Sequence, residues 1–138
     1  MSGQQAEIEG GKTEGVTPAV ARAIEMFAQR AKAEYGDHLR KILLFGSRAR
    51  RQATPDSDVD VAVVLDIVLD PGEDQNRLSD ITYDVLVETG AEVQPWPIPE
   101  AQWDDPQSAP NPVLIREMQS DGIEISANHD NRAVLQGF

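Results

Sequence analysis

Two acidic side chains at the start of a valine-rich run are the residues of this sequence best placed to do chemistry. Asp58 and Asp60 open the segment DVDVAVVL (58–65), whose β-branched residues predict a strand. Because side chains alternate between the faces of a strand, both acids point to one side, with Cα atoms about 6.5 Å apart. Two ionised carboxylates this close repel each other unless a cation lies between them. Oxygen ligands without a nearby His or Cys favour Mg²⁺ or Mn²⁺.

A Gly-Ser pair follows the preceding apolar run, KILLF (41–45), which predicts a buried strand. Gly46 lets the backbone approach a ligand closely, and Ser47 adds a hydroxyl donor. The polar connection after them is expected to hold a short helix before Pro55. The free N–H groups at the start of such a helix attract phosphate oxygens.

Three arginines follow Ser47 in an otherwise acidic chain. Arg48, Arg50 and Arg51 form a local basic cluster, and a guanidinium group matches the geometry of phosphate oxygens. Arg48 and Arg50 are therefore candidate nucleotide-binding residues. The sequence therefore places residues that can bind phosphate, the Gly-Ser pair and the arginines, close to two acids that can bind a cation. This is the arrangement needed to bind a nucleotide together with its metal ion.

Capping residues and hydrophobic periodicity predict the elements around these residues. Helices are expected from Thr17 to Gly36, through the stripe Leu78, Ile81 and Val85 to Gly90 after a break at Pro71 and Gly72, and from Asn111 to Gly122. A third strand is expected at 91–98, where prolines indicate a sheet edge, and a short one near Ile123 and Ile125. Trp96 and Trp103 are expected to pack against the helices. This order predicts an α/β (α+β) fold with a small mixed sheet flanked by helices.

Composition narrows the class of protein. The 138 residues include 12 Lys plus Arg and 24 Asp plus Glu, giving a net charge of −12, which argues against direct nucleic-acid or membrane-surface binding. The absence of cysteine excludes disulfides and thiolate metal sites. With no secretory signal or membrane-spanning pattern, we expect a cytoplasmic protein. We expect flexible tails at 1–15 and 127–138 around one domain at 16–126.

The order Gly-Ser, ten residues, Asp-X-Asp resembles the signature of the DNA polymerase β-like nucleotidyltransferase superfamily. The stretches LLFGSRAR and SDVDVAVVL look most like its smallest branch, the minimal nucleotidyltransferases, and imply the polymerase β-like fold. The resemblance spans about 17–125, and its specific part is 42–66. It implies that Gly46 and Ser47 bind the phosphates of ATP and that Asp58 and Asp60 ligate Mg²⁺.

The resemblance also implies a third carboxylate on a later strand, which would complete the metal site and help to deprotonate the attacking hydroxyl. The strand at 91–98 offers Glu92, where an Asp is common in the superfamily, and the neutral Gln94 two residues later. Glu92 is therefore the candidate third catalytic and metal-binding residue. Arg51 stands where relatives often carry Gly.

By the same resemblance, the expected reaction is the transfer of AMP from ATP to a hydroxyl group of a partner protein. Minimal nucleotidyltransferases of this kind are often antitoxins of HEPN-domain toxins, so a HEPN partner and a homo- or hetero-oligomer are expected. One alternative is an antitoxin that is catalytically weak or inactive and acts by direct binding. Another is an adenylyltransferase of small molecules such as aminoglycosides, whose relatives usually carry an additional helical domain.

Overall fold

A mixed β-sheet forms the centre of the computed structural model, which describes residues 16–54, 57–127 and 133–135. In these ranges five strands pair in the order β4-β3-β2-β5-β6. Their bounds are β2 Leu39–Phe45, β3 Val59–Leu65, β4 Val93–Pro99, β5 Ile123–Ala127 and β6 Ala133–Leu135. Helices lie on both faces, which confirms the predicted fold class.

The pairing of β3 fixes which residues of three strands lie side by side. β3 runs antiparallel to β2, with Phe45 opposite Asp60, and parallel to β4, with Asp60 opposite Gln94. β4 is an edge strand, as its prolines predicted, because a proline has no N–H to give to a further strand. The beginnings of β3 and β4 therefore meet the end of β2 at one end of the sheet.

The three long helices begin and end where their capping residues indicate. They are α1 Pro18–Tyr35, α2 Pro71–Thr89 and α4 Pro112–Asp121. Thr17 Oγ1 accepts a hydrogen bond from the N–H of Val20, and Asn111 Oδ1 accepts one from Leu114. Within the described ranges, none of the helices combines the length and apolar character needed to cross a membrane.

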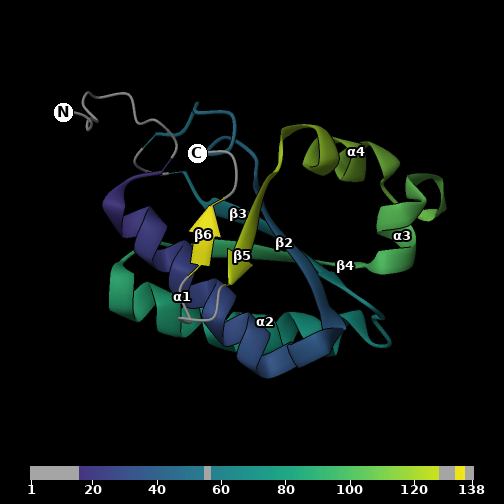
Figure 1. Cartoon of the computed structure of the whole chain (residues 1–138), viewed down its shortest axis with the longest axis horizontal. Coiled ribbons are helices and arrows are strands. Elements are labelled where there is room, and N and C mark those ends of the chain that lie inside the picture. Colours follow the sequence, from purple (N-terminus) through teal and green to yellow (C-terminus); the bar gives the residue numbers. More distant parts are fainter. Residues whose placement is uncertain (1–15, 55–56, 128–132, 136–138) are drawn as a thin grey trace.

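Side chains alternate between the two faces of the sheet, and both faces are apolar. Figure 1 shows α1 and α2 on one side of the sheet and α4 on the other. α1 and α2 cover one face, with a core that contains Ile24, Phe27, Leu44, Val59, Val61, Val63, Leu78 and Val85. α4 covers the other face, where the core contains Leu43, Phe45, Ala62, Val64, Ile98, Ile115 and Met118. Asp60 shares its side of β3 with Ala62 and Val64, so it lies at the end of this second face.

Two segments differ from the sequence-based expectation. Residues 46–51 form consecutive turns, and the described part of the connection from β2 to β3 contains no helix. The sequence placed a break at Pro71 and Gly72, but Asp70 caps α2 there by accepting from the N–H groups of Gly72 and Glu73. Pro71 is thus the first helical residue, a position that needs no N–H donor.

Several short elements were not predicted. They are the helix α3 Glu100–Asp104 and the 3₁₀ helices η1 Gly36–His38 and η2 Pro106–Ser108. Residues 133–135 were placed in a flexible C-terminal tail, but they form β6 and pair with β5, so that part of the prediction is wrong. The expected tail at 1–15 lies outside the described residues.

A buried tyrosine joins the two helices of the first face. Tyr35 is 7% exposed, and its hydroxyl donates to Asp74 Oδ1 at 2.9 Å, which links the end of α1 to α2. We predict that Tyr35→Phe lowers the free energy of unfolding by about 1 kcal/mol, because one hydrogen bond to a charged acceptor is lost. Urea unfolding measures the change. Tyr83→Phe, at a 66% exposed position of α2, is the control and should change little; equal effects would contradict the prediction.

Candidate nucleotide-binding and metal site

Gly46 occupies a position that only glycine fits well. Its φ is +79°, in the left-handed region that side chains disfavour. A Cβ atom added at Gly46 would lie 2.5 Å from Oδ2 of Asp60, closer than a Cβ atom comes to a neighbouring heavy atom in real proteins. The Asp60 carboxylate thus packs directly over the turn that ends β2. The two parts of the sequence motif, separated by the β2–β3 connection, meet at this point.

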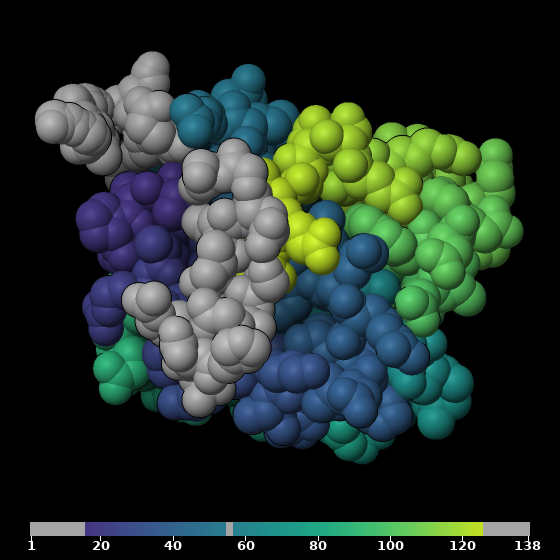
Figure 2. Space-filling view, viewed as in Figure 1, coloured from purple at the N-terminus to yellow at the C-terminus, as the bar shows by residue number. Residues whose placement is uncertain are grey.

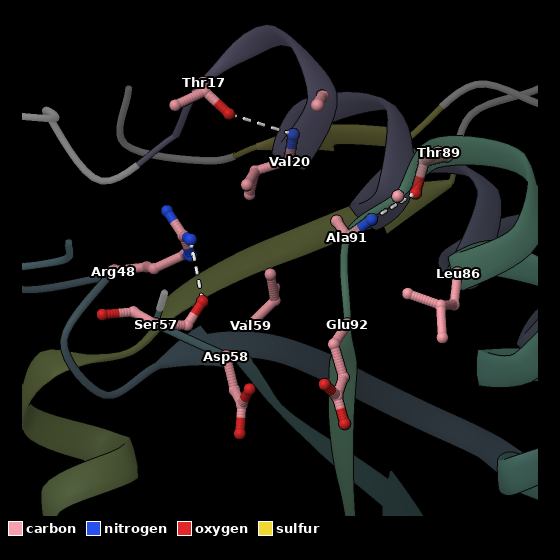
Figure 3. A pocket seen from close by; sticks show the side chains of 12 residues that line it. Thr17, Val20, Arg48, Ser57, Asp58, Val59, Leu86, Thr89, Ala91 and Glu92 are labelled. Carbon is pink, nitrogen blue, oxygen red and sulfur yellow. Dashed lines mark hydrogen bonds between the residues drawn. The ribbon is translucent and has the colours of Figure 1, made fainter. Parts of the chain in front are cut away.

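Asp58 and Asp60 lie on the same side of β3. Figure 3 shows the Asp58 side chain pointing away from Arg48 and Val20, whereas the intervening Val59 points toward Val20. Asp58 is exposed and Asp60 is half-buried. Burial raises the pKa of Asp60 and the negative charge of Asp58 raises it further, so the two carboxylates interact. A cation bound between them would relieve this repulsion.

Glu92 immediately precedes β4 and lines the same cavity as Asp58. Its backbone carbonyl accepts a hydrogen bond from the N–H of Val59 at 2.9 Å. The carboxylates of Glu92 and Asp58 point to the same side in Figure 3. Nevertheless, the described residues contain no group of three or more His, Cys, Asp or Glu side chains that could hold a metal ion. The role of Glu92 as a third ligand stays a prediction, and it requires the exposed side chain to move toward Asp60.

Gln94 is the β4 residue that lies opposite Asp60. We predict that Gln94→Glu, which keeps the shape and adds a charge, tightens Mn²⁺ binding about tenfold, because affinity rises with the number of charged ligands. Without metal the same change should lower stability, since a third carboxylate joins two that already repel. Titration with Mn²⁺ followed by electron paramagnetic resonance tests this. Gln107→Asp adds a charge to the exposed 3₁₀ helix η2 and is the control; equal affinities in the two variants would count against the prediction.

Backbone hydrogen bonds fix the shape of the turn that follows β2. The N–H of Arg50 donates to the carbonyl of Gly46 at 3.1 Å, and that of Gln52 donates to Ser47 at 2.8 Å. These bonds hold Ser47, a half-buried residue, beside Gly46. Since the expected helix is absent from the described turn, backbone N–H groups of the turn itself and the Ser47 hydroxyl take the place of a helix N-terminus as candidate phosphate donors.

Arg48 and Arg50 differ in their surroundings. Arg48 is 4% exposed, and its guanidinium donates to the carbonyl of Ser57 at 2.8 Å, which favours a role in shaping the loop before Asp58. Arg50 Nη1 lies 3.8 Å from Asp121 Oδ2 at the end of α4, and its charge lowers the pKa of Asp60. Figure 2 shows this turn next to the end of α4. Of the two, Arg50 is better placed to meet a phosphate.

Arg51 has a φ of +60°, unusual for a residue with a side chain. This backbone conformation explains why glycine would suit the position. No phosphate role for Arg51 follows from its conformation.

A cavity of about 390 Å³ adjoins the acids on the other face of the sheet. Figure 3 shows it between α1, the end of α2 and the start of β3. Its lining residues include Val20, Leu86, Ala91 and Arg48, with Asp58 and Glu92 among them, but not Gly46, Ser47 or Asp60. The cavity is therefore next to the acid pair rather than around it.

Trp96 contributes to the site in a way that the sequence did not reveal. It was expected to pack against helices, but its ring meets the edge of Phe45 at a centroid distance of 6.1 Å and an angle of 69°. Its side chain also acts on Asp60 and lowers the pKa of this acid, against the larger effect of burial, which raises it. The sequence signal for this contact is its spacing of two from Gln94, which puts both residues on one side of β4. Trp103 packs against the second core, as expected.

The residues around Asp58 and Asp60 suit a magnesium ion. Two carboxylates on one side of a strand provide only oxygen ligands, and Mg²⁺ in proteins is commonly held by one or two carboxylates, water and substrate phosphates. Their mutual repulsion gives a physical reason for a cation there. Such an ion would be held by Asp58 and Asp60.

A mixed sheet in which a glycine turn meets paired acids is the architecture of a nucleotidyltransferase. The family model described as "Nucleotidyltransferase domain" matches residues 24–119, and the chain belongs to this family. The match includes the turn at Gly46, Asp58 immediately before β3 and Asp60 within it. The nucleotidyltransferase class inferred from the motif is thereby confirmed.

Individual proteins match this chain either over a shorter segment or at a lower sequence identity. A Methanocaldococcus jannaschii protein with the provisional name of protein adenylyltransferase is 41% identical over 49 residues, which are 36% of this chain and 49% of that protein. The match thus spans about half the length of this curated relative.

Two solved structures of toxin–antitoxin complexes are also similar. A chain from a mutant MntA–HpeT complex is 21% identical, with 72% of this chain and 69% of that chain covered and a TM-score of 0.47. A chain from a toxin–antitoxin complex with AMP-PNP is 20% identical, with 72% and 71% covered and a TM-score of 0.49.

Proposed function

We propose that this protein transfers AMP from ATP to a hydroxyl group of a partner protein in a magnesium-dependent reaction. The observation that carries the proposal is the contact between Asp60 and the Gly46 turn, with Asp58 on the same side of β3, in a chain of the nucleotidyltransferase family. This arrangement brings a carboxylate pair and a phosphate-binding turn together. The similarity to a protein adenylyltransferase supports a protein as the acceptor.

Each residue near the acids has a distinct task in this proposal. Asp58 and Asp60 hold the metal, which when bound offsets phosphate charge and favours the ionised form of the acceptor hydroxyl. The turn at Gly46 and the Ser47 hydroxyl bind phosphate oxygens, and Arg50 offsets their negative charge.

The reaction balances as a displacement at the α-phosphorus of ATP. The acceptor oxygen forms a bond to that phosphorus while the bond to the bridging oxygen breaks, and pyrophosphate leaves with the electron pair. The acceptor proton goes to a base, for which the exposed Glu92 is the candidate beside Asp58.

The partner proposed is a HEPN-domain toxin, which this protein would silence as an antitoxin. The support is the resemblance of the motif to minimal nucleotidyltransferases, together with an acidic chain of −12 that suits a basic partner. The active complex would then be a hetero-oligomer.

Incubation with ATP labelled at the α-phosphate, Mg²⁺ and a candidate HEPN protein tests the function. We expect label on the partner with the wild-type protein and none with Asp58→Ala. Label from ATP carrying the radioisotope at the γ-phosphate should stay in solution, because that group leaves with pyrophosphate. Failure of the wild-type protein to label a partner that it binds would refute the transfer.

A second function, inhibition by binding alone, is favoured by one observation. The described residues hold no three-acid metal cluster, and the uncharged Gln94 lies opposite Asp60. If this function holds, Asp58→Ala and Asp60→Ala bind and inhibit the toxin as well as the wild-type protein does. Inhibition that requires ATP and both acids would exclude it.

A further inference from the structure

Three large apolar side chains lie exposed together on one face of α2. Tyr83 is 66% exposed, Leu86 40% and Val87 68%. Their spacing of three and four residues makes them neighbours on the surface of the helix. The face of a helix that points to solvent is ordinarily polar, and α2 already buries a separate apolar stripe against the core. These three residues, the α2 patch, therefore exceed what the fold itself needs.

Acidic side chains border the α2 patch. Asp80, Asp84 and Glu88 follow one another at intervals of four residues, and all three are exposed. Like charges at this spacing repel one another along a helix. In α2, which the structure describes in full, the last turn has no basic residue, although the helix dipole favours a cation there. Arg30 of α1 lies 3.0 Å from Asp84 and offsets its charge. The other two acids are complementary to a basic surface, which would relieve the repulsion.

The α2 patch is continuous with the cavity beside the acids of the site. Leu86 belongs to the patch and also lines the cavity of about 390 Å³, whose lining residues include Asp58 and Glu92. Figure 3 shows Leu86 on α2 and Glu92 around this cavity. Glu92 is exposed, and it is the candidate base for the acceptor hydroxyl. A protein that covers the patch therefore reaches the edge of the cavity where Glu92 lies.

We propose that the α2 patch is the surface on which the acceptor protein docks, and that the acceptor contacts it with apolar side chains flanked by lysine or arginine. The proposal rests on the proposed function, in which the acceptor is a protein. Apolar residues that include an aromatic one form the centre of this surface and acids form its border, which is the usual composition of a protein–protein interface. Because Leu86 joins the patch to the cavity, docking here brings an acceptor hydroxyl toward Glu92 and Asp58.

The first test removes the apolar contact and leaves the acids of the site unchanged. The probe is the purified HEPN-domain protein of the labelling experiment, and isothermal titration calorimetry measures its affinity for each variant. We expect Tyr83→Ala to lower the affinity at least about tenfold, because a tyrosine at the centre of an interface often carries much of the binding free energy. Val87→Ser should also lower it. Val113→Ser is the matched control, since Val113 is 63% exposed on α4, and its affinity should equal that of the wild-type protein.

The same variants should leave the chemical step intact. Tyr83 and Val87 are exposed and are not among the described residues that line the cavity, so the melting temperature and its rise with magnesium ATP should match the wild-type values. AMP transfer should then show a higher KM for the acceptor and an unchanged kcat, because docking holds the ground state and the transition state equally. Asp58→Asn should show the opposite pattern, with wild-type affinity for the acceptor and no transfer.

The second test addresses the acidic border. Glu88→Gln removes an acid that opposes the helix dipole in the last turn of α2, so the free protein should melt about 1–2 °C higher. Its affinity for the HEPN-domain protein should nevertheless fall, and should fall less at high ionic strength, because salt screens the attraction. Glu117→Gln makes the same change at an exposed residue of α4 and should leave the affinity unchanged.

The outcomes separate this docking surface from the function on which it rests. If the HEPN-domain protein is labelled, and folded Tyr83→Ala and Val87→Ser bind it as well as the wild-type protein does, the α2 patch is not the docking surface and the proposed function stands. An equal loss of affinity in Val113→Ser also overturns the assignment to α2. Binding without labelling refutes the transfer, and the affinities of the variants still decide where the partner docks. If the wild-type protein neither binds nor labels the HEPN-domain protein, both proposals fail.

Discussion

Asp58→Asn is expected to abolish AMP transfer and the stabilisation of the protein by magnesium ATP. The change keeps the shape of the side chain and removes the negative charge that would hold the cation. A metal ligand of this kind contributes several kcal/mol to the transition state, so the rate should fall at least about 10³-fold, which corresponds to about 4 kcal/mol. Asp60→Asn should have an effect of similar size, because its carboxylate interacts with that of Asp58.

Two measurements check this expectation. The rate is followed by transfer of α-phosphate label, and binding by the rise in melting temperature with magnesium ATP, since a ligand of the folded state stabilises it. Asp104→Asn is the matched control: it makes the same substitution at an exposed residue of α3, beyond the far end of β4. Transfer that survives in Asp58→Asn at the control rate would rule out the assigned role of this acid.

Gly46→Ala is expected to damage both stability and function. A φ of +79° costs a residue with a side chain about 1–2 kcal/mol. In addition, the new methyl group would lie 2.5 Å from Asp60 Oδ2, so the carboxylate must move. The melting temperature should fall by roughly 5 °C or more. Nucleotide-dependent stabilisation and transfer should disappear with the displaced carboxylate.

Gly90→Ala separates these two effects. Gly90 ends α2 with a φ of +81°, almost the same as that of Gly46, but an added Cβ there meets no other atom within 4 Å. It should therefore lose stability through its backbone alone while keeping nucleotide binding. If Gly46→Ala binds magnesium ATP as well as Gly90→Ala does, Asp60 tolerates the methyl group and the turn is not a constraint on the site.

Local sequence signals were sufficient for the helices. The caps Thr17 and Asn111 and the terminal residues Gly36 and Gly90 act within a few residues of the chain, so α1, the end of α2 and α4 lie where they were predicted. The prolines of β4 likewise revealed an edge strand, because a missing donor is a property of the residue itself.

The short elements and the turn depended on more distant contacts. Residues 46–51 form turns rather than a helix, and Arg48 is buried by its bonds to the loop that precedes β3. β6 forms only because β5 offers a partner strand. Neither the burial of one arginine among three nor the pairing of a three-residue segment is visible in a local pattern.

The sequence by itself determined which residues could do chemistry. These are a glycine-serine pair and two acids separated by one residue, and one family signature contains both. The tertiary structure alone decided what stands next to those acids. Strand pairing placed Gln94 opposite Asp60 and put Trp96 on the same side of the sheet. Within the described residues, Glu92 does not join Asp58 and Asp60 in a group that could hold a metal ion. The physical reason is that side-chain alternation is local to a strand, whereas the register between strands is set by packing across the whole sheet.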